Sequence, residues 1–193
     1  MPNWTQVEKE LADVLTDTCY AQRLGGKSPA QHAHECVQRA QGSALAAYSG
    51  EITVAELKHP ARPGFPTRLV RGYDTTRTYS PYGEWWIDYD LFERFRRATT
   101  KMPAGLRAQK VKDFMRARSA VSHDWSNMAG IAELELPPDA RTPALIGKAH
   151  YQKYITDTKH PEHVPNVFLM GGDTQFYVCF RERSWIRDLP LAA

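Results

Sequence analysis

Met170-Gly171-Gly172-Asp173-Thr174-Gln175-Phe176-Tyr177-Val178 is the stretch from which the rest of this chain is best interpreted. A short apolar run at 166–169 precedes it, and aromatic or β-branched residues follow Thr174, so the pattern predicts a strand, a glycine turn and a second strand. Adjacent glycines permit positive φ and a close approach of the backbone to a ligand. Gln175 lies beside the turn, and its amide donates and accepts hydrogen bonds at any pH. It is either a site residue or an exposed glutamine on a plain β-hairpin.

Upstream of this stretch, strand-like and helix-like segments are mixed. Strands are predicted at 67–73, 131–136 and 144–149, and amphipathic helices at 90–98 and 103–118. The clean alternation at 131–136 predicts a half-exposed strand. Together these segments indicate an α+β fold with a small, mostly antiparallel sheet.

The first fifty residues differ from the rest. Helices are predicted at 5–24, where Thr5 and Glu8 fit a capping box, and at 29–48 after Ser28. The sequence therefore predicts an N-terminal helical hairpin (1–50) followed by a second domain (51–193). Residues 53–58 fit one helical turn, and the prolines that follow predict an irregular linker.

Composition narrows the class of protein. A chain of 193 residues that is 42% hydrophobic can bury a core without disulfides or metals. No apolar run approaches the roughly 20 residues of a membrane span, and the first residues do not fit a signal peptide. We expect a cytoplasmic protein that does not bind membranes, with any delivery into a target cell by a route without a signal peptide. Three widely spaced cysteines, Cys19, Cys36 and Cys179, predict free thiols in a reducing compartment, with Cys179 buried and inert.

Two arginines in the predicted strand at 67–73 are candidates for anion binding. Alternation places Arg68 with Val70 on one face and Arg71 with Leu69 on the other. A planar guanidinium bonds two phosphate oxygens at once. Arg71 is the first candidate and Arg68 the fallback; the alternative is an arginine of an edge strand in water.

Paired tryptophans follow shortly after that strand, at Trp85 and Trp86. Tryptophan is costly to expose and can stack on a flat ring. Either both belong to the core, or one packs while the other lines a ligand pocket.

Three short motifs in order carry a resemblance to a known family. Leu69-Val70-Arg71-Gly72, Gly83-Glu84-Trp85-Trp86 and Gly171-Gly172-Asp173-Thr174-Gln175 resemble the Arg-Gly, Gly-x-(Phe/Trp)-Trp and Gly-Gly-x-(Thr/Ser)-Gln motifs of ADP-ribosyltransferase-like domains of bacterial polymorphic toxins. Residues 147–152 also look like the Gly-x-Ala-x-x-Gln segment of those domains. The resemblance covers roughly Pro66 to Phe180. It implies an ADP-ribosyltransferase-like fold with a split sheet.

The resemblance further implies cleavage of the nicotinamide–ribose bond of NAD+, which enters as substrate. Gln175 and Arg71 would be catalytic, with Gln175 on the ribose or the nucleophile and Arg71 on phosphate. Residues implied to bind NAD+ are Arg71, Gly72, Tyr79, Ser80, Trp85, Trp86 and Gly172. Many transferases of this fold carry a Ser-Thr-Ser motif, which this chain lacks, and Ser80 is the nearest substitute.

The acceptor stays open at this stage. A glutamine in place of the usual glutamate favours water, as in the similar toxin NAD glycohydrolases, because an amide does not activate a nucleophile as a carboxylate does. Transfer to a protein or nucleic acid is the other possibility, and this ADP-ribosyltransferase reaction is the first expectation, with water as the alternative acceptor. A toxin of this type implies a cognate immunity protein as partner. No metal is expected, since His160 and His163 lack a third ligand.

A cluster of positive charge supports a hypothesis of another class. Residues 94–118 hold nine Lys or Arg residues and a single acid, Asp113. These helices either present a solvated face or bind a nucleic acid or protein without catalysis.

Overall fold

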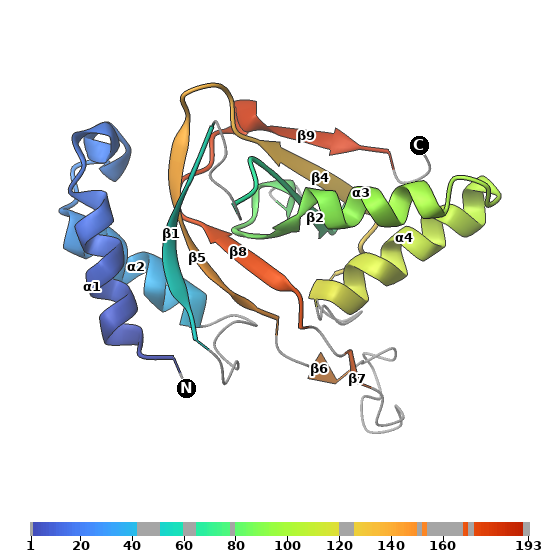
Figure 1. Cartoon of the computed structure of the whole chain (residues 1–193), viewed down its shortest axis with the longest axis horizontal. Helices are drawn as coiled ribbons and strands as arrows, with labels where there is room; N and C mark the ends of the chain where they lie inside the picture. The colour runs from blue at the N-terminus through green and yellow to red at the C-terminus, as the bar shows by residue number, and fades with distance from the viewer. Residues whose placement is uncertain are drawn as a thin grey trace.

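The computed structural model describes residues 2–41, 51–59, 65–77, 80–119, 126–149, 152–153, 168–169 and 172–190. Within these ranges the fold is α+β, as the sequence predicted, with one seven-stranded antiparallel sheet and flanking helices. In Figure 1, helices α1 and α2 lie at one end of the sheet and α3 and α4 at the other.

The large sheet has the strand order β1-β5-β8-β3-β2-β4-β9. Its members are β1 (Thr53–Lys58), β2 (Arg68–Tyr73), β3 (Trp85–Asp88), β4 (Gly130–Glu135), β5 (Arg141–Lys148), β8 (Thr174–Val178) and β9 (Ile186–Leu189). All six neighbouring pairs are antiparallel. A separate two-stranded sheet joins β6 (Gln152–Lys153) to β7 (Phe168–Leu169).

One apolar cluster extends across the sheet from the first edge strand to the last. Leu57 on the first edge strand and Ile186 on the last edge strand belong to this same cluster, with Leu69, Trp86 and Phe176 between them. The strand registers place these residues on the same face of the sheet, which is called the inner face here. Both helical pairs pack on the outer face, where alternate residues of the same strands point.

The first N-terminal helix is shorter than predicted, and residues 42–48 of the second predicted helix lie outside the described residues. Helix α1 spans Trp4–Leu15, with Asn3 as N-cap in place of Thr5, and a 3-10 segment, η1 (Thr18–Leu24), follows it. Asp17 ends the α-helix because its side chain accepts from the Cys19 amide and starts the new segment. Helix α2 (Pro29–Gln41) starts as predicted, with Ser28 and Gln31 exchanging cap hydrogen bonds.

The hairpin does not fold on a core of its own. Leu11 and Leu15 of α1 and Val37 of α2 share one buried cluster with Leu145 of β5 and Tyr177 of β8. The predicted boundary at residue 50 therefore separates segments of sequence that are packed together in space.

Two predictions about strands were wrong. Residues 53–58 form the edge strand β1, paired along its whole length with β5, instead of a helical turn. Six cross-strand pairs stabilise this segment as a strand, whereas one isolated helical turn lacks stability of its own. Strand β4 is not half-exposed, because helices cover one face and the inner cluster the other, and even Glu133 has no exposed surface.

The predicted hairpin around the glycine turn is also corrected. Strand β7 precedes the turn but pairs with β6, whereas β8 lies between β5 and β3. Gly172 has φ of +86°, as expected for a glycine of such a turn.

Helix α3 (Tyr89–Ala98) carries a glutamate, Glu93, that forms ion pairs with two arginines of the same helix. The Glu93 carboxylate accepts from Arg96 at 2.8 Å and from Arg97 at 3.0 Å, and these bonds lower its pKa from 4.5 to about 2, with Arg96 the larger cause. Because folding lowers the pKa of this carboxylate, its charged form stabilises the folded protein at pH values above the unfolded pKa. That stabilisation is lost as the pH falls from about 4.5 towards 2.

We therefore expect the stability difference between the wild type and Glu93→Gln to shrink across that pH interval. The measurement is the urea midpoint of both proteins at about pH 6 and about pH 3. An equal difference at both pH values would show that the charge of Glu93 contributes nothing.

Candidate functional site

The three motifs of the sequence lie on three neighbouring strands. Strand β8 carries Gln175, β3 carries Trp85 and Trp86, and β2 carries Arg71, in the spatial order β8-β3-β2. Strand β8 lies about ninety residues after β3 along the chain, whereas β2 and β3 are close in sequence. Arg71 is on an interior strand, so the edge-strand interpretation of this arginine was wrong.

Their side chains do not all leave the sheet on the same side. Gln175 pairs with Ile87 and Ile87 with Val70, so these three share the outer face. Arg71 follows Val70 and lies over the ring of Trp86 at 5.6 Å, on the inner face. The strands bring the motifs together, and the pleat separates Gln175 from Arg71.

The first group of residues is the turn site: Gly147, Arg118, Gly172, Asp173 and Gln175. Gly147 pairs with Gln175 across β5 and β8. The Gly172 amide donates to the Ala149 carbonyl at 2.8 Å, and the Ala149 amide donates to the Asp173 carbonyl at 2.9 Å. The Gly-x-Ala segment and the Gly-Gly turn, both singled out by resemblance, are thus hydrogen-bonded to each other.

Sequence reasoning missed the charged pair of the turn site. Arg118, near the end of helix α4 (Ala104–Ser119), donates to Oδ1 of Asp173 at 3.0 Å. Figure 1 shows this end of α4 beside the start of β8. The other carboxylate oxygen, Oδ2, is buried and accepts no hydrogen bond from the described part of the chain. The position of Asp173 inside the glycine motif was the available signal.

Burial raises the pKa of Asp173, and Arg118 only partly opposes that shift. The Asp173 carboxylate is mostly buried, lies two residues from Gln175 and is paired with one cation, Arg118. Groups with a pKa shifted by burial and a charge partner are often found at catalytic sites. Gln175 itself is 3% exposed. The turn site can therefore offer one negative charge and one amide to a bound cation.

The second group is the arginine cluster: Arg71, Gly83, Glu84, Trp86 and Arg181. The Arg71 guanidinium packs on Gly83, where an added Cβ would lie 1.6 Å from Nη1. Arg181 lies 3.4 Å from Glu84 and donates to the carbonyls of Val178 and Tyr82. A larger residue at position 83 would displace the guanidinium group, because that group occupies the place of the missing side chain.

Arg71 is unusual because its guanidinium group is largely buried and forms no ion pair with an acid in the described ranges, although Glu84 lies near enough to act on it. Its Nε and Nη1 atoms are buried and make no hydrogen bond to any described residue. Burial lowers its pKa to about 10, the nearby Arg181 acts in the same direction, and Glu84 opposes them. An unpaired buried charge costs several kcal/mol, which is typical of a group that awaits an anionic ligand.

The two tryptophans are divided between the faces. Trp86 is 1% exposed and packs in the inner cluster beside Phe176. Trp85 is half-buried on the outer face and meets Tyr177 edge-on at 5.0 Å. Trp86 therefore contacts Arg71, and Trp85 supports the packing of the N-terminal helices.

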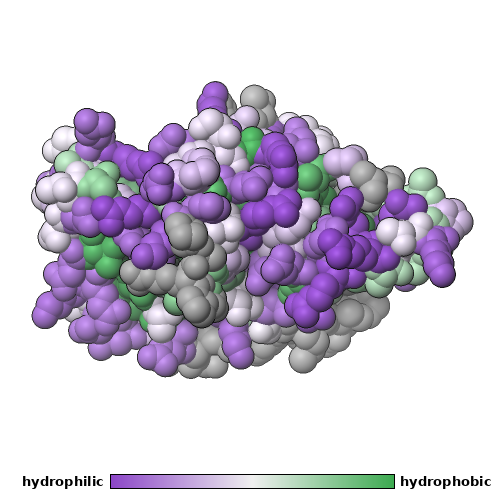
Figure 2. Space-filling model, turned by 45° about the horizontal axis from the view of Figure 1, so that its top comes forward, coloured by the Kyte–Doolittle hydropathy of each residue, from purple (hydrophilic) through white to green (hydrophobic). Residues whose placement is uncertain are grey.

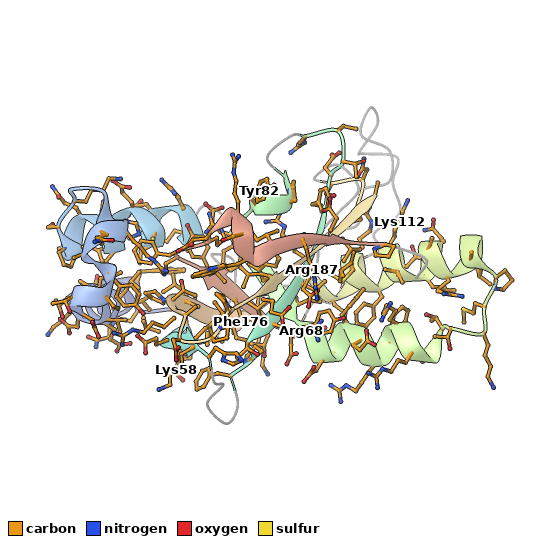
Figure 3. All side chains as sticks on the ribbon, turned by 90° about the horizontal axis from the view of Figure 1, so that it is seen from above. Lys58, Arg68, Tyr82, Lys112, Phe176 and Arg187 are labelled. Carbon is orange, nitrogen blue, oxygen red and sulfur yellow. The ribbon has the colours of Figure 1, made fainter. Side chains whose placement is uncertain are left out.

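Arg68, the fallback phosphate ligand, is on the same face as Gln175 but is already engaged. It donates to Glu133 and stacks on Tyr89 at 3.8 Å. Figure 3 shows Arg68 close to Arg187, the second partner of Glu133. Arg68 is thus part of an ion-pair network.

The remaining predicted residues contribute backbone or lie elsewhere. A Cβ on Gly72 would lie 2.2 Å from Met128 Sδ, so close packing requires this glycine. Ser80 starts the short 3-10 segment η2 (Ser80–Tyr82). Tyr79, His160 and His163 lie outside the described residues.

The basic cluster at 94–118 is not one solvated face. Arg116 is 2% exposed and donates to the Ser126 carbonyl, and Arg118 pairs with Asp173. Arg96 and Arg97 are neutralised by Glu93. Lys101, Lys110 and the exposed Arg94 remain as surface cations. Figure 2 shows one face of the molecule as largely hydrophilic, with apolar residues only in separate small groups.

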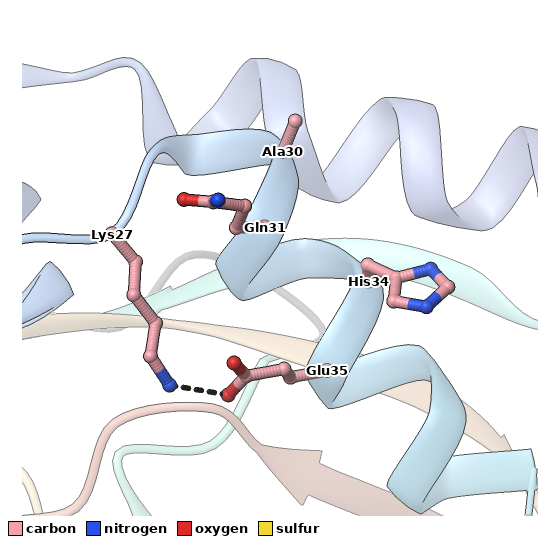
Figure 4. A pocket seen from close by; sticks show the side chains of 5 residues that line it. All are labelled: Lys27, Ala30, Gln31, His34 and Glu35. Carbon is pink, nitrogen blue, oxygen red and sulfur yellow. Dashed lines mark hydrogen bonds and ion pairs between the residues drawn. The ribbon is translucent and has the colours of Figure 1, made fainter.

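Two open hollows lie away from both groups. One, of about 480 Å³, is lined by α2 and the turn before it, with an ion pair of 2.5 Å between Lys27 and Glu35 (Figure 4). The other, of about 460 Å³, is lined by Asp88, Asp90, Glu93, Arg94 and Arg97. Neither contains a motif residue.

The described ranges lack both a metal-ligand cluster and a membrane-spanning helix. They contain no set of three His, Cys, Asp or Glu residues placed to hold a metal ion. They also contain no helix with the length and apolar character needed to cross a membrane. No protein-family model, curated protein or solved structure matches the chain.

Proposed function

We propose that this protein is an NAD+-consuming enzyme of the ADP-ribosyltransferase-like type, which cleaves the nicotinamide–ribose bond and acts as a toxin. The observation that carries the proposal is the order β8-β3-β2, which makes neighbours of the three strands bearing the glycine–glutamine, tryptophan and arginine motifs. Nothing in the spacing of the motifs along the chain requires that adjacency.

The reaction needs little general acid catalysis from the protein. Nicotinamide in NAD+ is a cationic leaving group, and its departure leaves positive charge on the ribose. Asp173, with Oδ2 buried and Arg118 holding Oδ1, would stabilise that charge electrostatically. Gln175, two residues further on, would orient the ribose hydroxyls or the attacking nucleophile through its amide.

Arg71 enters the proposal with a limited role. It has a desolvated guanidinium suited to phosphate, but it leaves the sheet on the face opposite Gln175. We therefore assign the bond-breaking step to the turn site alone and treat Arg71 as a separate anion-binding residue that its own variant tests.

The acceptor is proposed to be a macromolecule, with water as the alternative. The experiment is incubation of the purified chain with NAD+ labelled in its adenosine half, with and without cell lysate. Label on protein or nucleic acid supports transfer, label in free ADP-ribose supports an NAD+ glycohydrolase, and intact NAD+ under both conditions contradicts the enzyme.

A second function is favoured by the separation of Gln175 from Arg71. A non-enzymatic module would bind nucleic acid or protein through the exposed cations of α3, α4 and the turn between them, such as Arg94, Lys101 and Lys110. Intact NAD+ together with salt-dependent binding to single-stranded or duplex nucleic acid would support it, because phosphate contacts release counterions. A toxin, by contrast, would have an immunity protein as partner.

A further inference from the structure

Two cysteines that are distant in sequence meet where the N-terminal hairpin packs on the sheet. Cys36 is on α2, 4% exposed, among the residues that face the sheet. Cys179 directly follows β8 and is two residues from Tyr177, so it shares the outer face towards α2. Both belong to the apolar contact between hairpin and sheet, and both are free thiols.

The two thiols interact with each other. His32, one helical turn before Cys36, stacks on Phe180 at 4.7 Å, and Arg39, three residues after Cys36, lies 3.8 Å from Glu84. These contacts on both sides of Cys36 place it beside Cys179 in the shared apolar cluster. Cys179 is partly exposed, and not fully buried as expected from the sequence. A disulfide between two elements forms without large backbone movement where the Cα atoms of the cysteines lie within about 7 Å of each other.

The surrounding charges favour a thiolate at Cys36. Its pKa is lowered first by the hydrogen bond from Cys179 and then by His32 and Arg39, against the effect of burial. Around Cys179, the bond to Cys36, burial and Glu84 raise the pKa, and Arg181 opposes them. The thiolate is the reactive form of cysteine, so the two sulfurs have different roles.

We propose that Cys36 and Cys179 form an oxidation site, in which a peroxide converts the thiol pair into a disulfide that fixes helix α2 to the end of β8. The Cys36 thiolate attacks a peroxide oxygen and the O–O bond breaks, which leaves a sulfenic acid on Cys36. The released hydroxide takes a proton and becomes water. The Cys179 sulfur then attacks the Cys36 sulfur, and the departing hydroxide takes the Cys179 proton as a second water. The thiols lose two electrons and the peroxide gains them.

The test uses a Cys19→Ser background, because Cys19 is the exposed third thiol. The protein is treated with hydrogen peroxide and denatured, its thiols are alkylated with a maleimide, and its intact mass is recorded. We expect alkylation to fall from both thiols to neither and to return fully after dithiothreitol. The denaturation midpoint should rise on oxidation and fall back on reduction, since a disulfide restricts the unfolded chain.

Cys36→Ser and Cys179→Ser are the matched controls, and each should keep a single thiol without a reducible bridge. Peptide mapping of the unaltered chain without reduction locates the bridge even if a variant fails to fold. Two thiols that stay alkylatable, oxygen atoms added to Cys36 without a bridge, or only disulfide-linked dimers would each overturn the proposal.

Discussion

Replacing Glu133 with glutamine is expected to lower the free energy of unfolding by about 3 kcal/mol, because breaking a buried ion pair leaves uncompensated charge. The Glu133 side chain is completely buried and binds Arg68 through one oxygen and Arg187 through the other. An amide removes the negative charge and leaves two guanidinium groups facing each other. The change is measured by unfolding both proteins in guanidinium chloride and following tryptophan fluorescence.

Glu135 supplies the control for that prediction. Its side chain is 49% exposed and lies 3.4 Å from Arg187, so Glu135→Gln should cost less than about 1 kcal/mol. Equal losses for the two variants would mean that Glu133 stabilises β4 through something other than its buried charge.

Replacing Arg71 with methionine is expected to raise the free energy of unfolding by about 1–3 kcal/mol, since an apolar side chain of similar length removes a buried, unmatched cation. The long side chain packs against Gly83 and Trp86, and methionine can fill that space. Arg94→Met, at an exposed position, should leave stability nearly unchanged. A loss of stability in Arg71→Met would show that the guanidinium is structural.

The same variant tests the assignment of Arg71 to an anionic ligand. If Arg71 holds the phosphates of NAD+, a gain in stability should be accompanied by a higher KM. A stabilised variant with an unchanged KM would place the arginine cluster outside the NAD+ site. The wild type would then be less stable than Arg71→Met but would bind NAD+ better, and such a trade-off is common at binding sites.

Local patterns in the sequence predicted much of the fold but little of the site geometry. The cap at Ser28, the helices near 90–98 and 103–118 and the strand at 67–73 follow from spacing within one segment. Residues 53–58 were misassigned because their strand form depends on β5, about ninety residues later. The partners of Glu133, Asp173 and Cys36 are likewise distant residues. Periodicity carries no information about such pairs.

The opposite directions of Gln175 and Arg71 show this limit most clearly. Each residue was placed correctly on a strand, and alternation within β2 separated Arg71 from Arg68 as predicted. The relation between β2 and β8, however, depends on the register of β3 with both. A shift of one residue in either pairing would have brought Gln175 to the other face.

The measurement that tests the central claim most directly is the rate of nicotinamide release from NAD+ by the wild type and by Gln175→Ala. Gln22→Ala, the same change at an exposed position of η1, is the control, and thermal unfolding confirms that each variant is folded. We predict steady release by the wild type and the control, with a decrease of about a hundred-fold or more in Gln175→Ala, the usual loss for one transition-state hydrogen bond. No release by the wild type, or equal release by folded Gln175→Ala, would contradict the account.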